Sequence, residues 1–106
     1  MRWMFFVLMA VFAALANPAH ADVASGKNRA TMACAVCHGQ QGLSTIPNAP
    51  HLAGQPKIYL VEQLRNYRSG KRQHEVMGVI AKPLTDVEID NLAQWYSSIP
   101  IRVEAQ

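Results

Sequence analysis

Apolar residues recur every three or four positions in three stretches of the chain, a spacing that places them on one face of a helix. The pattern is clearest in Thr85–Ser98, which begins with the Thr-x-x-Glu sequence of a capping box and is followed by Pro100. A second apolar stripe predicts a helix over Pro56–Ser69, where proline is tolerated in the first turn. A third helix is expected over Val23–Ala35, although it contains Gly26. Glycine costs about 1 kcal/mol relative to alanine inside a helix, so Gly26 indicates either close approach of another helix or fraying near the helix start.

The segments between these helices carry turn-forming residues. Glycine and proline are frequent in Gly39–Gly54, which predicts a long loop, and loops of this length usually wrap a ligand or serve a function. Lys71–Leu84 contains Gly78 and Pro83 and is expected to be irregular. No segment alternates apolar and polar residues with the period of a strand. The predicted fold class is therefore all-α, with three main helices.

The first 21 residues have the composition of a secretory leader. Arg2 supplies a positive charge, residues 3–16 are continuously apolar, and Ala19-His20-Ala21 matches a small-x-small cleavage sequence. The apolar run is shorter than the roughly 18 to 20 residues that a membrane-spanning helix requires, so a permanent anchor is the less favoured interpretation. We expect residues 1–21 to be a cleaved signal peptide and residues 22–106 to form one domain, exported to the periplasm without stable insertion in the membrane.

The charge pattern gives no support for nucleic acid binding. The net charge of +3 includes Arg2 of the leader, and residues 22–106 carry nine basic and seven acidic side chains. No dense run of Lys and Arg with interleaved aromatic residues is present. A domain of 85 residues also buries only a small apolar core, so its folding free energy is marginal without a further stabilising element.

The sequence Cys34-Ala35-Val36-Cys37-His38 has the Cys-x-x-Cys-His pattern of a c-type haem attachment site. Its two thiols lie about one helical turn apart on one side of the backbone, where both can form thioethers with the vinyl groups of one porphyrin. His38 follows directly, so its imidazole is delivered to the iron on the same side. Because the motif occurs once, we expect one haem. A covalent haem would add the apolar surface that a short chain lacks, and we expect the protein to fold poorly without it.

Three other interpretations of the two cysteines are weaker. A thiol–disulfide redox pair is typical of a strand–turn–helix context, and no strand pattern precedes Cys34. A closed zinc site needs four ligands, and the sequence contains no second cysteine pair. A structural disulfide of an exported protein would leave His38 without a role.

The haem iron would have a second axial position opposite His38. Met77 is the favoured ligand, because it lies between the second and third helices, where the chain can bend around the ring edge, and because methionine is a common partner of histidine on haem iron. His74 is the next candidate, and an open position is the third alternative. His51 is too close in sequence to the attachment site to reach the opposite face easily, and Met32 lies on the attachment helix itself.

Together these residues resemble class I cytochromes c, in particular single-haem proteins similar to one half of the bacterial di-haem cytochromes c. The resemblance covers almost all of residues 24–99. It is carried by the attachment motif with Gly39 and by five further segments: Pro50-His51-Leu52-Ala53-Gly54-Gln55, Tyr59-Leu60-Val61-Glu62-Gln63-Leu64, Ser69-Gly70-Lys71-Arg72, Glu75-Val76-Met77 and Leu84-Thr85-Asp86.

The resemblance implies the fold of a small class I cytochrome c, with loops wrapped around one covalently bound haem. It implies that Cys34 and Cys37 hold the vinyl carbons, that His38 and Met77 are the axial iron ligands, and that the Pro50 carbonyl accepts a hydrogen bond from the second ring nitrogen of His38. It also places Gly26 where the first helix crosses the last, near Trp95 or Tyr96. One departure from the relatives is that Val79 and Ile80 stand where a second methionine often follows Met77, which bears on the potential.

The resemblance further implies a periplasmic electron carrier, not an enzyme, with redox proteins as donor and acceptor. Alternatives are a haem subunit of a larger oxidoreductase and a haem protein whose open sixth position binds a small ligand. Four basic residues could form a rim that attracts an acidic partner, but an ordinary solvated surface is slightly favoured. These residues are Lys57, Lys71, Arg72 and Lys82.

Overall fold

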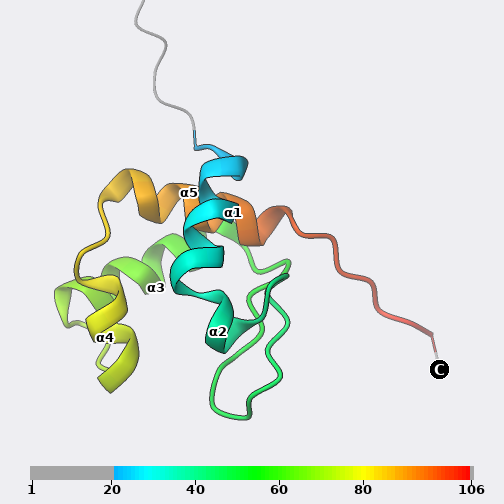
Figure 1. Cartoon of the computed structure of the whole chain (residues 1–106), viewed down its shortest axis with the longest axis horizontal. Coiled ribbons are helices and arrows are strands. Elements are labelled where there is room, and N and C mark those ends of the chain that lie inside the picture. Colours follow the sequence, from blue (N-terminus) through cyan, green and yellow to red (C-terminus); the bar gives the residue numbers. More distant parts are fainter. Residues whose placement is uncertain (1–20, 106) are drawn as a thin grey trace, which may run out of the picture.

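The computed structural model describes residues 21–105, and within this range the chain forms five helices and no strand (Figure 1). The helices are α1 (Val23–Ala33), α2 (Ala35–His38), α3 (Lys57–Ser69), α4 (Glu75–Ala81) and α5 (Asp86–Ser98). The prediction of an all-α fold is confirmed. The expected leader lies outside the described residues, apart from Ala21. None of the helices in the described range is both long and apolar enough to cross a lipid bilayer.

Two of the predicted segments differ from the structure. The first predicted helix is interrupted at Cys34, which separates α1 from α2 with φ −116° and ψ −33°. The segment Lys71–Leu84, expected to be irregular, contains the seven-residue helix α4. That expectation was wrong because Gly78 is tolerated inside α4, whose apolar residues Met77, Ile80 and Ala81 recur at helical spacing on its more buried side.

Helices α1 and α5 make the most extensive helix–helix contact of the described fold (Figure 1). Gly26 lies in this contact, and a Cβ atom placed on it would be 2.0 Å from the Asn91 carbonyl oxygen and 2.9 Å from the Trp95 Cβ atom. Such distances are far inside van der Waals contact. The structure therefore assigns Gly26 to close helix packing, and the alternative of simple fraying is not supported. Beside this crossing, the Lys27 ammonium lies 5.4 Å from the centre of the Trp95 ring.

We expect Gly26→Ala to lower the free energy of unfolding by about 2 kcal/mol, within the range typical of overpacked interfaces. The new methyl group forces α1 away from α5, and this cost exceeds the gain of about 1 kcal/mol in helix propensity. Urea unfolding monitored by far-UV circular dichroism measures the change. Asn28→Ala is the matched control, because it raises helix propensity at an exposed position of the same helix. A Gly26→Ala protein at least as stable as Asn28→Ala would contradict this account of the crossing.

The start of α5 is fixed by side chains as the sequence predicts. The Glu88 amide donates to the Thr85 hydroxyl at 3.1 Å, and the Thr85 amide donates to the Glu88 carboxylate at 3.2 Å, which completes the capping box. Arg68 of α3 reaches across to the same end, donating to the Leu84 carbonyl at 3.0 Å and to the Asp86 carboxylate at 2.6 Å. This guanidinium lowers the pKa of Asp86. The contacts tie the end of α3 to the beginning of α5.

The apolar core of the described residues is small. The only large side chains that are fully buried in this range are Ile89 and Leu92, and five of the other buried core residues are alanines. Many larger apolar side chains remain only partly buried around this cluster. They include Leu52, Val61, Leu64, Tyr67, Trp95 and Ile99.

Candidate functional site

The two cysteines flank the single turn of α2. The Cys37 and His38 amides donate to the Cys34 carbonyl at 3.2 and 3.0 Å, so the thiols lie one turn apart on the backbone, as the spacing predicts. Both cysteines are free and partly buried. Gly39 ends the turn with φ +82°, and a Cβ atom there would be 2.0 Å from the Leu43 carbonyl oxygen. Glycine at this position lets the chain reverse directly after the histidine.

His38 is the only buried charged or polar residue among the described ones, with 7% of its surface exposed. Its Nδ1 atom lies 2.9 Å from the carbonyl oxygen of Pro50. The hydrogen bond requires the proton to be on Nδ1, because a carbonyl only accepts. In the neutral imidazole, Nε2 is then the nitrogen with the lone pair that can bind a metal. A histidine held in this way is oriented and made more basic as a metal ligand.

The loop that presents Pro50 is tied back to the attachment segment. The Ser44 hydroxyl donates to the Cys37 carbonyl at 2.9 Å, and the Ser44 amide donates to Nδ1 of His51 at 2.8 Å. His51 directly follows Pro50, whose carbonyl contacts His38. The hydrogen bonds and the peptide chain thus form a closed ring around the loop. We call Ser44 and His51 the loop clasp; its geometry fixes where the Pro50 carbonyl lies relative to the His38 ring.

The Cys34 thiol lies in a partly buried environment. Burial raises the pKa of the Cys34 thiol, while the neighbouring Tyr96 hydroxyl and the Arg29 charge act in the opposite direction. Burial, with Cys34 beside it, also raises the pKa of Tyr96, so the phenol remains protonated at physiological pH. The Cys34 thiol is the group beside the buried Tyr96 hydroxyl, and within residues 21–105 that hydroxyl makes no regular hydrogen bond to another group. An available donor therefore lies next to the first attachment thiol.

Met77 lies in the first turn of α4 and is partly buried, whereas its neighbours Val76 and Val79 are 53% and 72% exposed. The expectation that Met77 lies in a loop is therefore wrong, although its place between the second and third predicted helices stands. The ring nitrogen Nδ1 of His74 accepts hydrogen bonds from the Val76 and Met77 amides. Nδ1 of His51 likewise accepts from a backbone amide, that of Ser44, so both histidines use Nδ1 to hold the backbone.

Residues 23–99 match the family described as cytochrome c. The chain belongs to the cytochrome c family.

Individual relatives of this cytochrome c agree with the match. Cytochrome c4 of Thiocapsa roseopersicina is 41% identical over 85 residues, which cover 80% of this chain and 44% of that protein. Cytochrome c-554(548) of Halomonas halodenitrificans is 35% identical over 80 residues, covering 73% of this chain and 95% of that protein. The solved cytochrome c4 of Acidithiobacillus ferrooxidans superimposes with a TM-score of 0.71 at 32% identity, covering 79% of this chain and 53% of that one. The chain spans about half the length of these cytochromes c4 and has the class I cytochrome c fold.

The residues of this cytochrome c fit the covalent c-type haem that the family carries. The two free thiols lie one turn apart, and the imidazole that follows them is buried and oriented by the contact of its Nδ1 with the Pro50 carbonyl. Partly buried apolar side chains around a small core supply the surface against which a porphyrin packs. Cys34 and Cys37 thus fit, with His38, the Cys-x-x-Cys-His motif of a covalent haem.

The other interpretations of the cysteines lack support in the structure. Residues 21–105 contain no strand before Cys34, which removes the context of a thioredoxin-like redox pair. Nowhere in that range do three His, Cys, Asp or Glu side chains gather as they would around a zinc ion. The thiols of Cys34 and Cys37 are not joined in a disulfide.

Proposed function

We propose that this chain is an electron-transfer protein of the periplasm, with one covalent c-type haem whose axial iron ligands are His38 and Met77. The observation that supports it best is the buried His38 ring, whose Nδ1 lies 2.9 Å from the Pro50 carbonyl. The haem, when bound, supplies an iron that alternates between the ferric and ferrous states. The solved relative from Acidithiobacillus ferrooxidans is described in terms of complex-induced tuning of electron transfer.

The residues of the chain would set the conditions for that exchange. Cys34 and Cys37 fix the position of the ring covalently. The Pro50 carbonyl makes the His38 imidazole a stronger donor, while the Met77 thioether raises the potential relative to a second histidine. The partly buried apolar side chains around the core would limit access of water to the ring. A rigid ligand set of this kind requires little rearrangement when the oxidation state changes.

Export is part of the proposal. Residues 1–21 would direct the chain across the inner membrane and be removed, which leaves residues 22–106 as a single cytochrome c domain. Its partners would be redox proteins that bind weakly and dissociate quickly, as small redox interfaces do.

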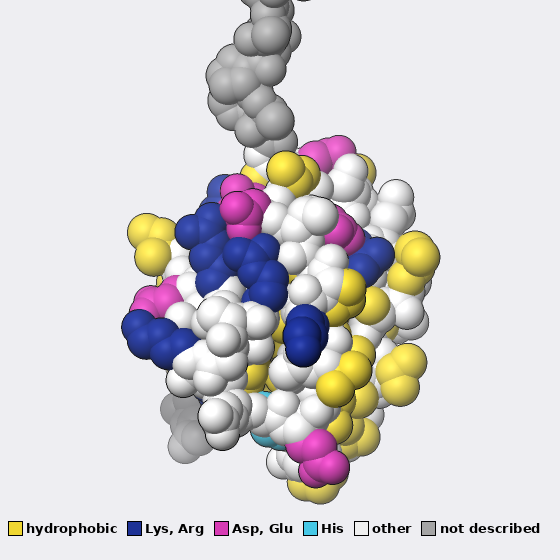
Figure 2. Space-filling model, turned by 90° about the vertical axis from the view of Figure 1, so that its left-hand side faces the viewer, with side chains coloured by type: hydrophobic (Ala, Val, Ile, Leu, Met, Phe, Trp, Pro, Cys, Tyr) yellow, Lys and Arg dark blue, Asp and Glu magenta, His cyan; other side chains and the backbone are white. Residues whose placement is uncertain are grey.

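A compact basic rim is not needed for this role. Lys57 begins α3, and Lys71 follows the C-cap Gly70 at its other end, so a helix of that length separates them by about 20 Å. The face in Figure 2 does carry several Lys and Arg side chains, but acidic side chains lie among them, and Arg68 is paired with Asp86 at 2.6 Å. Arg72 is directed to Gln63 at 2.8 Å. The arrangement fits a mixed, solvated surface better than a single positive docking rim.

Absorption spectra of the purified protein, oxidised and reduced, test the proposal directly. We expect a low-spin c-type spectrum, a weak sulfur-to-iron charge-transfer band in the oxidised form, and no rapid change when carbon monoxide is added to the reduced form. A high-spin spectrum with carbon monoxide binding as fast as mixing would instead establish an open sixth position, which is the property of a ligand-binding haem protein.

A further inference from the structure

Helix α4 begins with a histidine as its N-cap. His74 has the extended backbone of a capping residue, with φ −154° and ψ 134°. Its Nδ1 accepts from the Val76 amide at 3.1 Å and from the Met77 amide at 3.2 Å, while its carbonyl accepts from the Gly78 amide at 2.9 Å. The side chain thus satisfies two of the amides that a helix start leaves without partners.

Histidine is not among the residues usually preferred at this position, which are Ser, Thr, Asp and Asn. It can serve here only as the tautomer with its proton on Nε2, because Nδ1 must be an acceptor. The ring is also contacted from α3: Tyr67 meets it edge-on, with centroids 6.3 Å apart and planes at 78°. Arg72 covers the Tyr67 ring in turn, at 4.7 Å. The cap is therefore oriented by packing as well as by its two hydrogen bonds.

Helix α4 is too short to be stable as an isolated helix. Helices well below about 12 residues are marginal in water even with favourable sequences, and α4 has seven. Its position depends on contacts with α3 and on its cap. One of the two amides bonded to His74 belongs to Met77 itself. The cap thus fixes the backbone of the residue whose side chain is the proposed ligand.

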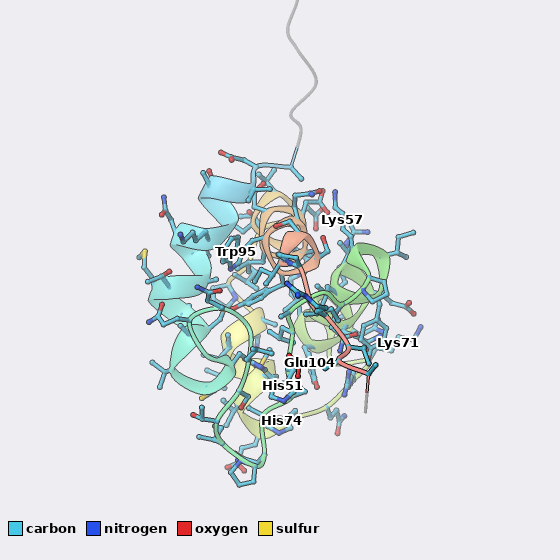
Figure 3. The ribbon with its side chains drawn as sticks, turned by 90° about the vertical axis from the view of Figure 1, so that its right-hand side faces the viewer. His51, Lys57, Lys71, His74, Trp95 and Glu104 are labelled. Carbon is cyan, nitrogen blue, oxygen red and sulfur yellow. The ribbon has the colours of Figure 1, made fainter. Side chains whose placement is uncertain are left out.

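We propose that His74 is a positioning residue for Met77: by capping α4 it holds the backbone from which the Met77 thioether reaches the iron. The inference rests on the proposed His38–Met77 ligation. His74 lies at the same lower end of the molecule as His51 in Figure 3, so both histidines hold a backbone segment at this end of the fold. His51 holds the loop whose Pro50 carbonyl contacts His38, and His74 holds the start of the helix that carries Met77.

The test compares His74→Ala with His74→Asn in the purified haem protein. In His74→Ala we expect a weaker sulfur-to-iron charge-transfer band and about fivefold faster binding of imidazole to the ferric form, because imidazole enters when Met77 leaves the iron. Fivefold is the equilibrium factor that a typical capping bond represents. In His74→Asn we expect both properties to return to the wild-type values, because asparagine is an effective cap.

Thr85→Ala is the matched control, since it removes the cap of α5, a helix that does not carry Met77. It is expected to reduce stability against urea about as much as His74→Ala while leaving the imidazole rate within twofold of the wild type. Nitrogen-15 spectra of the reduced wild-type protein supply a measurement that requires no variant. They should show His74 with an unprotonated, hydrogen-bonded Nδ1 and a proton on Nε2.

The possible outcomes distinguish failure of the His38–Met77 ligation from failure of the positioning role of His74. A wild-type protein without the charge-transfer band would overturn the ligation itself. A wild-type protein with the band, but with His74→Ala no faster toward imidazole than Thr85→Ala, would overturn the positioning role. A His74→Asn protein as impaired as His74→Ala would show that the ring contact with Tyr67, and not the cap, is what matters. A protonated Nδ1 in the wild type would also overturn the role of the cap.

Discussion

Replacement of Cys34 and Cys37 by serine together is expected to give a protein without covalent haem that is largely unfolded at room temperature. The chemical part of the expectation is direct, because a serine hydroxyl does not form the thioether that anchors the ring. The structural part follows from the core. Of the large side chains in residues 21–105, only Ile89 and Leu92 are fully buried, which is little apolar burial for a domain of this size.

The conformational entropy lost on folding is about 1 to 2 kcal/mol for each ordered residue, and burial of apolar surface is the main term that offsets it. Here much of the available apolar surface, including Leu52, Leu64 and Tyr67, is only partly buried by protein. Covalent haem would cover such side chains and add its own apolar surface. Its loss removes both contributions, so the remaining contacts between α1, α3 and α5 do not suffice.

Far-UV circular dichroism and urea titration of the double variant measure the outcome. We expect low helical content and no cooperative transition, whereas the wild-type haem protein should unfold in one sharp step. Cys34→Ser and Cys37→Ser alone are informative controls, because each keeps one thioether and should retain part of the stability. A haem-free double variant with wild-type helical content and a sharp transition would show that the protein core is sufficient by itself.

The parts of the fold that the sequence predicts are those with a local signal. Helix α5 has an apolar stripe and a capping box, and the structure contains both. Helix α4 was not predicted, because it is short, contains Gly78 and begins at a histidine, which is absent from the usual set of caps. The break at Cys34 has no local signal either, since neither glycine nor proline occurs between α1 and α2.

The candidate site likewise has parts that the sequence predicts and parts that it does not. The attachment segment is a contiguous motif with a fixed chemistry, so Cys34, Cys37 and His38 could be named from five residues. The contact between Pro50 and His38 was implied only by the family resemblance, because no spacing rule brings residues 12 positions apart together. The loop clasp of Ser44 and His51 was not anticipated at all. It depends on the closed path of the loop, which apolar periodicity does not report.

Replacement of Met77 by alanine is expected to remove the sulfur-to-iron charge-transfer band and to lower the reduction potential by more than about 100 mV. Axial ligands move haem potentials over a range of about 0.8 V, and a methionine partner of histidine lies toward its high end. The thioether is a weak donor that stabilises ferrous iron relative to ferric iron, so its loss favours the oxidised state. Visible spectroscopy and a redox titration measure both effects.

Met32→Ala is the control for this variant, because it removes a second methionine that is 78% exposed on α1, and it should change neither property. A Met77→Ala protein with an unchanged band and potential would exclude Met77 as a ligand. Occupation of the vacated position by His74 would also lower the potential, but the spectrum would remain low-spin. The double variant Met77→Ala/His74→Asn distinguishes these cases. If His74 replaces the thioether in Met77→Ala, the second substitution converts the iron to high spin and opens it to carbon monoxide. If His74 does not replace it, the spectrum of Met77→Ala alone is already high-spin.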